Sequence, residues 1–294
     1  MEFGLILPSY RAGATTAGIE SSADTAARLG WHSVFTTDHV LVEPSARSED
    51  YFHIFDPLLT LAHLGARVPE LRLGVSVIVV PMRNAVVLAK ELATLDALSS
   101  GRLICGVGVG WNRTEFGFLG AAERFGRRGA YLEESIALWR HLWDGRTGPF
   151  KGRFHQFDDI RFGPLPVQGA AVPIWIGGRS EAALARAGRV ADGYHASGTS
   201  PAQMAVRIPL IRAAAEQSGR AMPRLSARVR VVFGAYEADG GYAIAGTAEQ
   251  MVGELGAWRE LGVDHLAFDF AETDAGRIRE LIERFDGEVL SALR

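Results

Sequence analysis

Short apolar runs alternate with longer amphipathic segments along the chain. The runs are rich in β-branched residues, and the segments between them place apolar side chains at helical spacing, which is typical of strands joined by crossover helices. We predict eight strands, at residues 3–7, 33–36, 73–80, 103–109, 173–176, 193–195, 227–233 and 265–268. This alternation favours a closed (β/α)8 TIM barrel of the α/β class over a doubly wound open sheet.

Local signals mark the helix boundaries. Thr247 and Gln250 have the spacing of a capping box, and Gly101 ends the third predicted helix. Pro209 lies inside the sixth predicted helix, where we expect it to kink or interrupt the hydrogen-bond ladder.

Two longer segments interrupt the alternation. Residues 40–55 follow the second strand, and long loops after barrel strands lie at the catalytic mouth, where they often act as lids. Residues 145–172 lie between the fourth helix and the fifth strand and contain four phenylalanines. We expect this insertion to form a small hairpin at the flank or the opposite end of the barrel, as a structural element or an interface. All 294 residues are then predicted to form one domain.

The composition is that of an ordinary globular enzyme, with 48% hydrophobic and 22% charged residues. A net charge of −3 without a basic block argues against nucleic acid and anionic membranes as partners. No apolar run reaches the roughly 18 residues of a membrane span, and no basic or apolar leader precedes the first strand, so we expect a cytoplasmic protein. The lone Cys105 lies in an apolar strand and is interpreted as a core residue.

The predicted strand ends lack the residues of several common chemistries. They show no metal-ligand spacing, so we expect no metal, and no lysine for Schiff-base chemistry. They also lack paired glutamates, a nucleophile elbow and a Walker A loop. The remaining residues favour a barrel in which a bound redox cofactor carries the chemistry.

Glycine occupies alternate positions at the end of the fourth strand: 106, 108 and 110. Alternate side chains of a strand point to the same face, so these glycines leave one face bare. Such a face, followed by Trp111-Asn112, suits a flat cofactor ring. The alternative is that the glycines make room for a packed neighbour.

Two other strand ends carry candidate chemistry. Gly177-Gly178-Arg179-Ser180 opens a helix, and its amides, guanidinium and hydroxyl suit a phosphate, although Ser180 could be an ordinary helix cap. Asp38-His39 ends the second strand, where histidine can move a proton and aspartate can orient it, unless His39 is a buried structural residue. His195 gives a weaker signal of the same kind.

These motifs resemble the bacterial-luciferase-like flavin and deazaflavin oxidoreductases. The similar segments are FGLILP, TTDH, GVSVIVVP, SGRLICGVGVGWN, PLPVQGAAVPIWIGGRS, ADGYH, GT-x-EQ and ELGVDHL, which together span most of the chain. The resemblance implies a barrel that binds FMN or its 5-deaza relative, coenzyme F420, at the C-terminal mouth. The GWN ending is most similar to the deazaflavin-dependent branch common in actinobacteria, and the arginine-rich, lysine-poor composition agrees with such a host.

The resemblance also implies a non-proline cis peptide at Ser76-Val77, behind the ring system. We interpret His39 and Asp38 as catalytic, and Trp111 and His195 as substrate-pocket residues. The predicted cofactor-binding residues are Asp38, Ser76, Val77, Gly108, Gly110, Asn112, Gly177, Gly178, Arg179 and Ser180.

One family pattern is missing. Deazaflavin sugar-phosphate dehydrogenases place a catalytic glutamate where this chain has Trp111, and their substrate-binding lysines have no counterpart here. We therefore expect an F420-dependent oxidoreductase that transfers a hydride between the deazaflavin and a small organic substrate other than a sugar phosphate. The alternatives are a two-component FMN-dependent monooxygenase and a non-catalytic flavin-binding barrel.

The resemblance further implies a homodimer, because the family often pairs through the second and third helices. These helices carry more apolar residues than one inward stripe needs, although a broad core face would explain them equally. The residues are Leu58, Leu59, Leu61, Leu64, Val86, Val87 and Leu88.

Overall fold

A closed parallel barrel forms the centre of the computed structural model, which describes residues 1–45, 48–146, 148–237 and 241–293. Within these residues, the barrel strands are β1 (Glu2–Ile6), β2 (Ser33–Thr36), β3 (Arg72–Val75) continued by β4 (Ile78–Val79), β5 (Leu103–Gly108), β8 (Ile174–Gly177), β9 (Gly193–Ser197), β10 (Arg224–Phe233) and β12 (His265–Asp269). β12 pairs with both β10 and β1, which closes the sheet and confirms the predicted (β/α)8 barrel.

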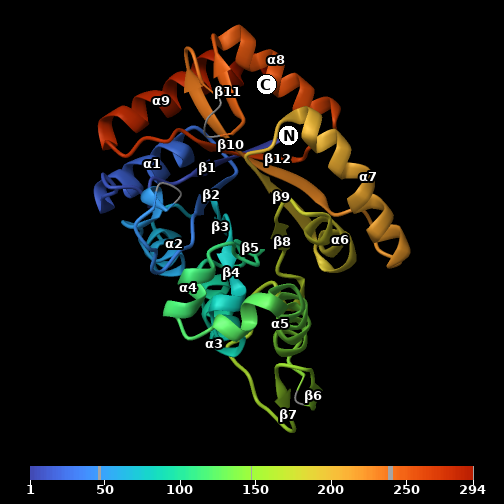
Figure 1. Cartoon of the computed structure of the whole chain (residues 1–294). Helices are drawn as coiled ribbons and strands as arrows, with labels where there is room; N and C mark the ends of the chain where they lie inside the picture. The colour runs from blue at the N-terminus through green and yellow to red at the C-terminus, as the bar shows by residue number, and fades with distance from the viewer. Residues whose placement is uncertain (46–47, 147, 238–240, 294) are drawn as a thin grey trace.

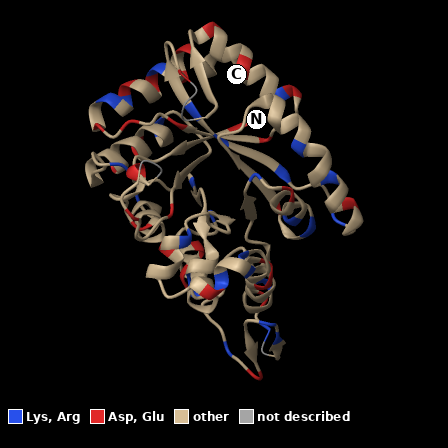
Figure 2. Ribbon diagram, in the orientation of Figure 1, with Lys and Arg blue, Asp and Glu red and all other residues tan. Residues whose placement is uncertain are grey.

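Helices surround this barrel (Figure 1). They are α1 (Thr16–Arg28), α2 (Pro57–Gly65), α3 (Ala85–Leu98), α5 (Arg128–Trp143), α6 (Glu181–Val190), α7 (Pro201–Gln217), α8 (Ala248–Glu260) and α9 (Ala275–Glu288), with the short α4 (Arg113–Phe118) before α5. The predicted capping box of Thr247 and Gln250 is present at the start of α8. Most charged positions lie on helices and loops, and the strands carry few (Figure 2).

Two parts of the apolar core surround and fill the barrel, and a third joins Val79, Met82, Phe116 and Ala121. The larger part lies between the strands and the helices and contains the buried Cys105, as expected. The smaller part fills the inside of the barrel, because it joins Phe35 of β2 to Trp175 of β8, whose ring centroids lie 6.1 Å apart although the two strands do not pair. Glycine on a neighbouring strand makes room for each ring: a Cβ at Gly74 would lie 2.2 Å from Phe35, and one at Gly193 would lie 2.4 Å from Trp175.

The structure corrects several predicted boundaries. The third strand is divided into β3 and β4 by the peptide between Ser76 and Val77, which is cis as predicted. α7 continues through Pro209, so the proline does not end the helix, and the expected kink there stays a prediction. β10 begins three residues before its predicted start, and β11 (Ala243–Gly246), which pairs with β10, was not predicted.

The two longer segments, residues 145–172 and 40–55, lie outside the regular alternation of strands and helices. β6 (Phe150–Lys151) and β7 (Gln156–Phe157) form the predicted hairpin, and residue 147 of this insertion is outside the described residues. Glu134 of α5 accepts hydrogen bonds from three backbone N–H groups of the hairpin, which fastens it to the flank of the barrel beyond α5 (Figure 1). In the other segment, residues 46–47 are outside the described part of the chain.

No helix in the described ranges is long and apolar enough to cross a membrane.

Candidate functional site

A cavity of about 440 Å³ opens at the carboxyl ends of the strands, within the size range of small-molecule sites. It gathers eleven of the residues that the sequence singled out, from five different strand ends. These are Asp38, His39, Ser76, Val77, Gly108, Gly110, Trp111, Gly177, Gly178, Arg179 and His195. The predicted convergence of Asp38, Ser76, Gly110 and Gly178 on one pocket is therefore confirmed.

Asn112 and Ser180 do not line this cavity. The Asn112 side chain caps α4 by accepting hydrogen bonds from the backbone of Thr114 and Glu115, and it donates to Glu43. Ser180 caps α6 by accepting from the Ala183 N–H. Both side chains are therefore occupied by the local structure that orients the adjacent loop.

The glycine run has a packing role as well as a place at the cavity. A Cβ at Gly106 would lie 1.8 Å from the carbonyl oxygen of Val75, so this glycine makes room for the backbone where β3 ends. A Cβ at Gly108 would lie 2.7 Å from the Val77 side chain. Gly108 and Gly110 nevertheless line the cavity, and Gly110 has a positive φ of 74°. Room for a packed neighbour therefore accounts for Gly106. For Gly108 and Gly110, both that explanation and a bare face for a cofactor ring are consistent with the structure.

Asp38 is held by Arg83 and not by His39. Its Oδ1 accepts from Arg83 Nη2 at 2.6 Å, and its Oδ2 accepts from the Val79 N–H at 2.8 Å. The side chain of Asp38 has no exposed surface. These contacts tie the end of β2 to the turn after β4, and they leave the predicted orientation of His39 to another group.

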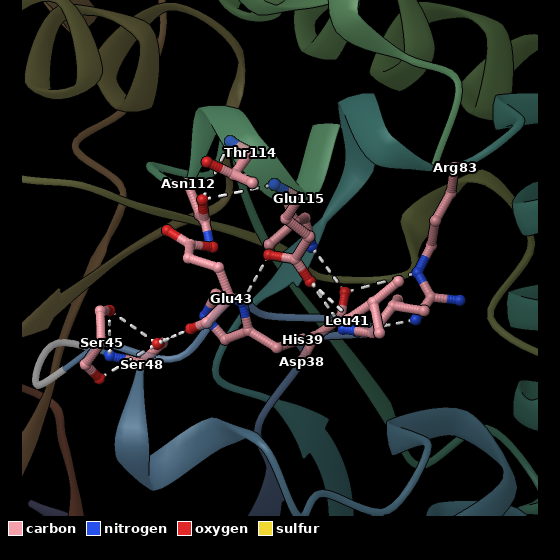
Figure 3. Close-up of polar contacts among 12 residues, drawn as sticks. Asp38, His39, Leu41, Glu43, Ser45, Ser48, Arg83, Asn112, Thr114 and Glu115 are labelled. Carbon is pink, nitrogen blue, oxygen red and sulfur yellow. Dashed lines mark hydrogen bonds and ion pairs between the residues drawn. The ribbon is translucent and has the colours of Figure 1, made fainter. Parts of the chain in front are cut away.

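That group is Glu115, on the first turn of α4 (Figure 3). His39 Nδ1 and Glu115 Oε2 lie 2.7 Å apart, and the Glu115 side chain is fully buried. Glu115 Oε1 accepts from the backbone N–H groups of Val40 and Leu41, at 2.7 and 3.3 Å. The carboxylate therefore fixes both the imidazole and the start of the following loop, and directs Nε2 of His39 away from Glu115.

The sequence reasoning missed Glu115. A signal existed, because Asn112-x-x-Glu115 has the spacing of a helix cap followed by an acidic residue in the first turn. That spacing predicts only a helix start, and it does not identify the histidine that the carboxylate meets 76 positions earlier in the chain.

Aromatic rings surround the imidazole. Tyr51 and Trp111 lie 4.4 and 5.6 Å from the His39 ring, between centroids, and both line the cavity. Tyr51 belongs to the segment 40–55, so the prediction that this segment reaches the mouth is confirmed. The arrangement gives His39 an apolar wall on two sides.

Arg179 lines the cavity at the end of β8, beside a glycine with φ of 138° at position 178. A neighbouring cavity of about 170 Å³ is lined by four arginines, Arg11, Arg179, Arg228 and Arg230, and by two aspartates, Asp50 and Asp269. The arginines outnumber the carboxylates on this side of the mouth, so its net charge is positive, as an anionic group would require.

A buried ionic cluster, also missed from the sequence, lies beneath that cationic side. Arg228 donates to Asp269 at 2.7 Å, to Thr37 at 3.1 Å and to the Tyr10 hydroxyl. Burial alone would raise the pKa of the Asp269 carboxyl, but Arg228 and Arg11 outweigh burial and lower it. Within the described residues, no group of side chains could hold a metal ion.

His195 lies at the floor of the cavity, where only 2% of its surface is exposed. Its Nε2 is 2.9 Å from Ser76 Oγ, and its Nδ1 is 2.8 Å from Ser226 Oγ. Burial, with a contribution from Arg228, lowers the pKa of His195 to about 3. The ring is therefore neutral near pH 7.

Comparison with known proteins agrees with this architecture. The chain is 34% identical over 227 residues to an F420-dependent glucose-6-phosphate dehydrogenase of Nakamurella multipartita; the match covers 74% of this chain and 64% of that relative. Among solved structures, the monooxygenase RslO1 of Streptomyces bottropensis has a TM-score of 0.82 at 20% identity, with full coverage of both chains. An F420-dependent secondary alcohol dehydrogenase, solved with an F420-acetone adduct, also has a TM-score of 0.82, at 17% identity and 98% coverage of each chain.

At these identities the two solved structures establish the fold alone. The family model described as luciferase-like monooxygenase matches residues 1–239. The chain therefore belongs to the luciferase-like monooxygenase family.

Proposed function

We propose that this chain is an F420-dependent oxidoreductase that transfers a hydride between the deazaflavin and a small organic substrate. The observation that carries the proposal is one cavity with a carboxylate-held imidazole, His39, on one wall and Arg179 beside a glycine pair on another. The similarity to an F420-dependent dehydrogenase supports F420 over FMN.

The residues present fit such a cofactor. Gly108, Gly177 and Gly178 line the cavity without side chains, so they present backbone to a flat ring, and Arg179 offers a forked cation to a phosphate. When bound, the deazaflavin supplies a hydride-donating or hydride-accepting carbon, which no side chain supplies. Asp38, although it lines the cavity, is paired with Arg83, so we assign it to holding the loop at the edge of the cofactor site.

His39 is the group we assign to proton transfer. In the neutral imidazole, Glu115 accepts the Nδ1 proton and leaves the Nε2 lone pair able to take a proton from the substrate. In the charged ring, Nε2 donates that proton in the reverse direction. Glu115 is a positioning residue, because it fixes the tautomer and the ring plane.

The chemistry of the cavity favours an apolar or aromatic substrate. Trp111 and Tyr51 form its wall beside His39. Neither lysine of the chain lines it: Lys90 bonds to Gly163, and Lys151 pairs with Asp158 in the hairpin. We therefore propose a substrate other than a sugar phosphate, unlike the substrate in the name of the Nakamurella relative.

Titration of the purified protein with F420 and with FMN, followed by fluorescence, tests the cofactor. We expect tighter binding of F420, and little oxygen consumption by the loaded protein, because a deazaflavin lacks N5. Preferential FMN binding with rapid oxygen consumption would instead establish a two-component monooxygenase. Binding without turnover of any hydride acceptor or donor would favour a non-catalytic flavin-binding barrel.

Arg179→Ala is expected to weaken F420 binding by about tenfold to a hundredfold, because it removes a charge-assisted contact worth roughly 1.5–3 kcal/mol. Isothermal titration measures the change. Arg212→Ala, an exposed position on α7, is the matched control and should bind normally. Unchanged affinity in Arg179→Ala would locate the phosphate elsewhere, most simply on the loops after β10 and β12.

We also propose that the chain is a homodimer through α2 and α3. Of the seven apolar residues in question, Leu58, Leu61, Leu64 and Leu88 are buried in the core, so part of the pattern is a core face. Leu59 and Val87, however, are 74% and 54% exposed, and Leu98 on the same pair of helices is 67% exposed. Leu59 and Leu98 line a groove between the two helices, which pack against each other, and Val87 is exposed on the same helix as Leu98.

Light scattering should give about twice the chain mass of 31.8 kDa at micromolar concentrations. Leu59→Glu combined with Val87→Glu should give the monomer mass, because burying two carboxylates in an apolar interface is unfavourable. Val206→Glu, equally exposed but on α7, should leave the dimer intact. A monomer mass for the unmodified protein would contradict the proposal.

A further inference from the structure

A continuous chain of polar side chains crosses the inside of the barrel from the cavity to the amino ends of the strands. Its members, in order, are Ser76, His195, Ser226, His265, Ser33, His32 and Glu2. Neighbouring members lie 2.8 to 3.1 Å apart, and the last step, from His32 Nε2 to Glu2 Oε2, is 3.3 Å. The proposed reaction uses none of these contacts.

The middle of this chain is sealed from solvent. Ser33, Ser226 and His265 have no exposed surface. The Phe35 ring stacks on His195, with 5.6 Å between centroids and 10° between planes, and Trp175 lies 5.2 Å from the His265 ring. Because water is excluded there, the polar groups must satisfy one another.

The hydrogen bonds along this series of side chains all run in one donor-to-acceptor direction. A neutral imidazole carries one donor and one acceptor, so Ser226, between His195 and His265, donates to one ring and accepts from the other. Burial lowers the pKa of His265 well below its usual range, as it lowers that of His195, so both rings are neutral.

The carboxylate at the lower end decides which direction is adopted. Glu2 only accepts, so we assign the resting proton of His32 to Nε2, 3.3 Å from Glu2 Oε2, and the acceptor role toward Ser33 to Nδ1. The same alternation, continued upward, puts the proton of His265 on Nε2 and that of His195 on Nδ1. Ser76 then donates to His195 Nε2 and presents its lone pairs to the cavity.

We propose that this chain is a proton relay between the cavity and the amino end of the barrel. A proton that reaches Ser76 Oγ from a bound ligand moves the Ser76 proton to His195 Nε2, and each following member passes its own proton to the next. His32 ends with protons on both nitrogens, beside Glu2. One proton has left the ligand, one has been added to His32, and every interior member keeps its proton count.

The relay therefore has two states. In the resting state Ser76 is an acceptor toward the cavity; after transfer it accepts from His195 and donates into the cavity. The reverse movement restores the resting tautomers without turning an imidazole ring. Such a relay can serve a reaction in which one half releases a proton and the other half takes one up. This inference rests on the proposed function and adds to it a path for the proton.

His32 is the member of the relay that can exchange a proton with solvent, because its side chain is partly exposed. It is faced by Glu2 from β1, Arg72 from β3, Arg224 from β10 and His265 from β12. Burial lowers the pKa of His32, Glu2 opposes that shift, and Arg72 and Arg224 add to it. His32 is more exposed than His195 and lies beside Glu2, so we expect His32 to take up a proton from solvent before the His195 ring does.

Nitrogen-15 NMR of the histidine rings tests the relay in the protein without cofactor. At neutral pH we expect the proton of His195 on Nδ1 and that of His265 on Nε2. As the pH falls and His32 takes up a proton, His195 should stay neutral and move its own proton from Nδ1 to Nε2. The midpoint of this tautomer change should equal the midpoint of the His32 titration. A His195 tautomer that does not change while His32 titrates would overturn the proposal.

Variants that remove one hydroxyl from the relay provide the second part of the test. Ser226→Ala, or Ser33→Ala should the first variant fold poorly, is expected to abolish the response of His195 to His32. Ser135→Ala is the matched control, because Ser135 is equally buried but bonds only within α5, and it should leave the response intact. A His195 tautomer that still changes with the titration of His32 in Ser226→Ala or Ser33→Ala would refute the relay. Failure of the protein to bind F420 would contradict the proposed function and leave this measurement valid.

Discussion

Replacing His39 by alanine is expected to lower the turnover number by about 10²- to 10⁴-fold, the usual effect of losing a general acid or base. F420 affinity should change little, because the cofactor phosphate is assigned to Arg179, on a different strand end. Steady-state kinetics, isothermal titration and melting temperature together measure the effect. The physical reason is that Nε2 of His39 is the imidazole nitrogen that Glu115 leaves available at the cavity.

Two further variants make this result specific. Glu115→Gln keeps the shape but removes the carboxylate that fixes the ring, so turnover should fall by less than in His39→Ala. His53→Ala removes a histidine of the segment 40–55 that bonds to the Ala14 carbonyl outside the cavity, and it should leave turnover unchanged. A His39→Ala protein that is less stable but turns over normally would show that His39 is only a packed residue.

Asp269→Ala is expected to lower the free energy of unfolding by about 3–5 kcal/mol, because it leaves Arg228 as a buried charge without its carboxylate. Asp269 Oδ2 accepts from Arg228 at 2.7 Å and from Tyr10 at 2.7 Å, and the two ionic side chains are 8% and 12% exposed. Denaturant unfolding measures the loss. The double variant Asp269→Leu with Arg228→Met should lose less stability than Asp269→Ala, since it removes both charges.

The pH dependence of that difference follows from the direction of the pKa shift. The pKa of Asp269 is lowered in the folded protein, so its stabilising effect is complete above the unfolded value of about 3.9. It is lost as the pH falls through the folded pKa. The stability gap between the wild type and Asp269→Ala should therefore be constant near neutrality and shrink only below about pH 4. A gap that closes near pH 6 would assign the effect to another group.

The barrel could be predicted because its signals are local. Alternating apolar runs and amphipathic segments specify strands and helices through side-chain periodicity, and a cap such as Thr247 with Gln250 marks a helix start within four residues. The failures had local causes as well. The pattern did not distinguish β11 from the adjoining loop, and it predicted the start of β10 three residues too late.

The location of the site followed from topology. Once eight parallel strands close, their carboxyl ends meet at one mouth, so residues such as His39, Ser76 and Arg179 are brought together although they are far apart in sequence. The cis peptide at Ser76-Val77 was predicted from a family resemblance, and its position in the sequence was correct.

The sequence by itself therefore determined the barrel, its family and the strand ends that line the cavity. Only the tertiary structure decided which side chains pair: His39 with Glu115, Asp38 with Arg83, and Arg228 with Asp269. The physical reason is that strand periodicity states which face a side chain occupies, whereas a hydrogen bond depends on the register and separation of elements that are distant in sequence. The interior chain from Ser76 to Glu2 needs such contacts between several strands at once, so no local pattern could reveal it.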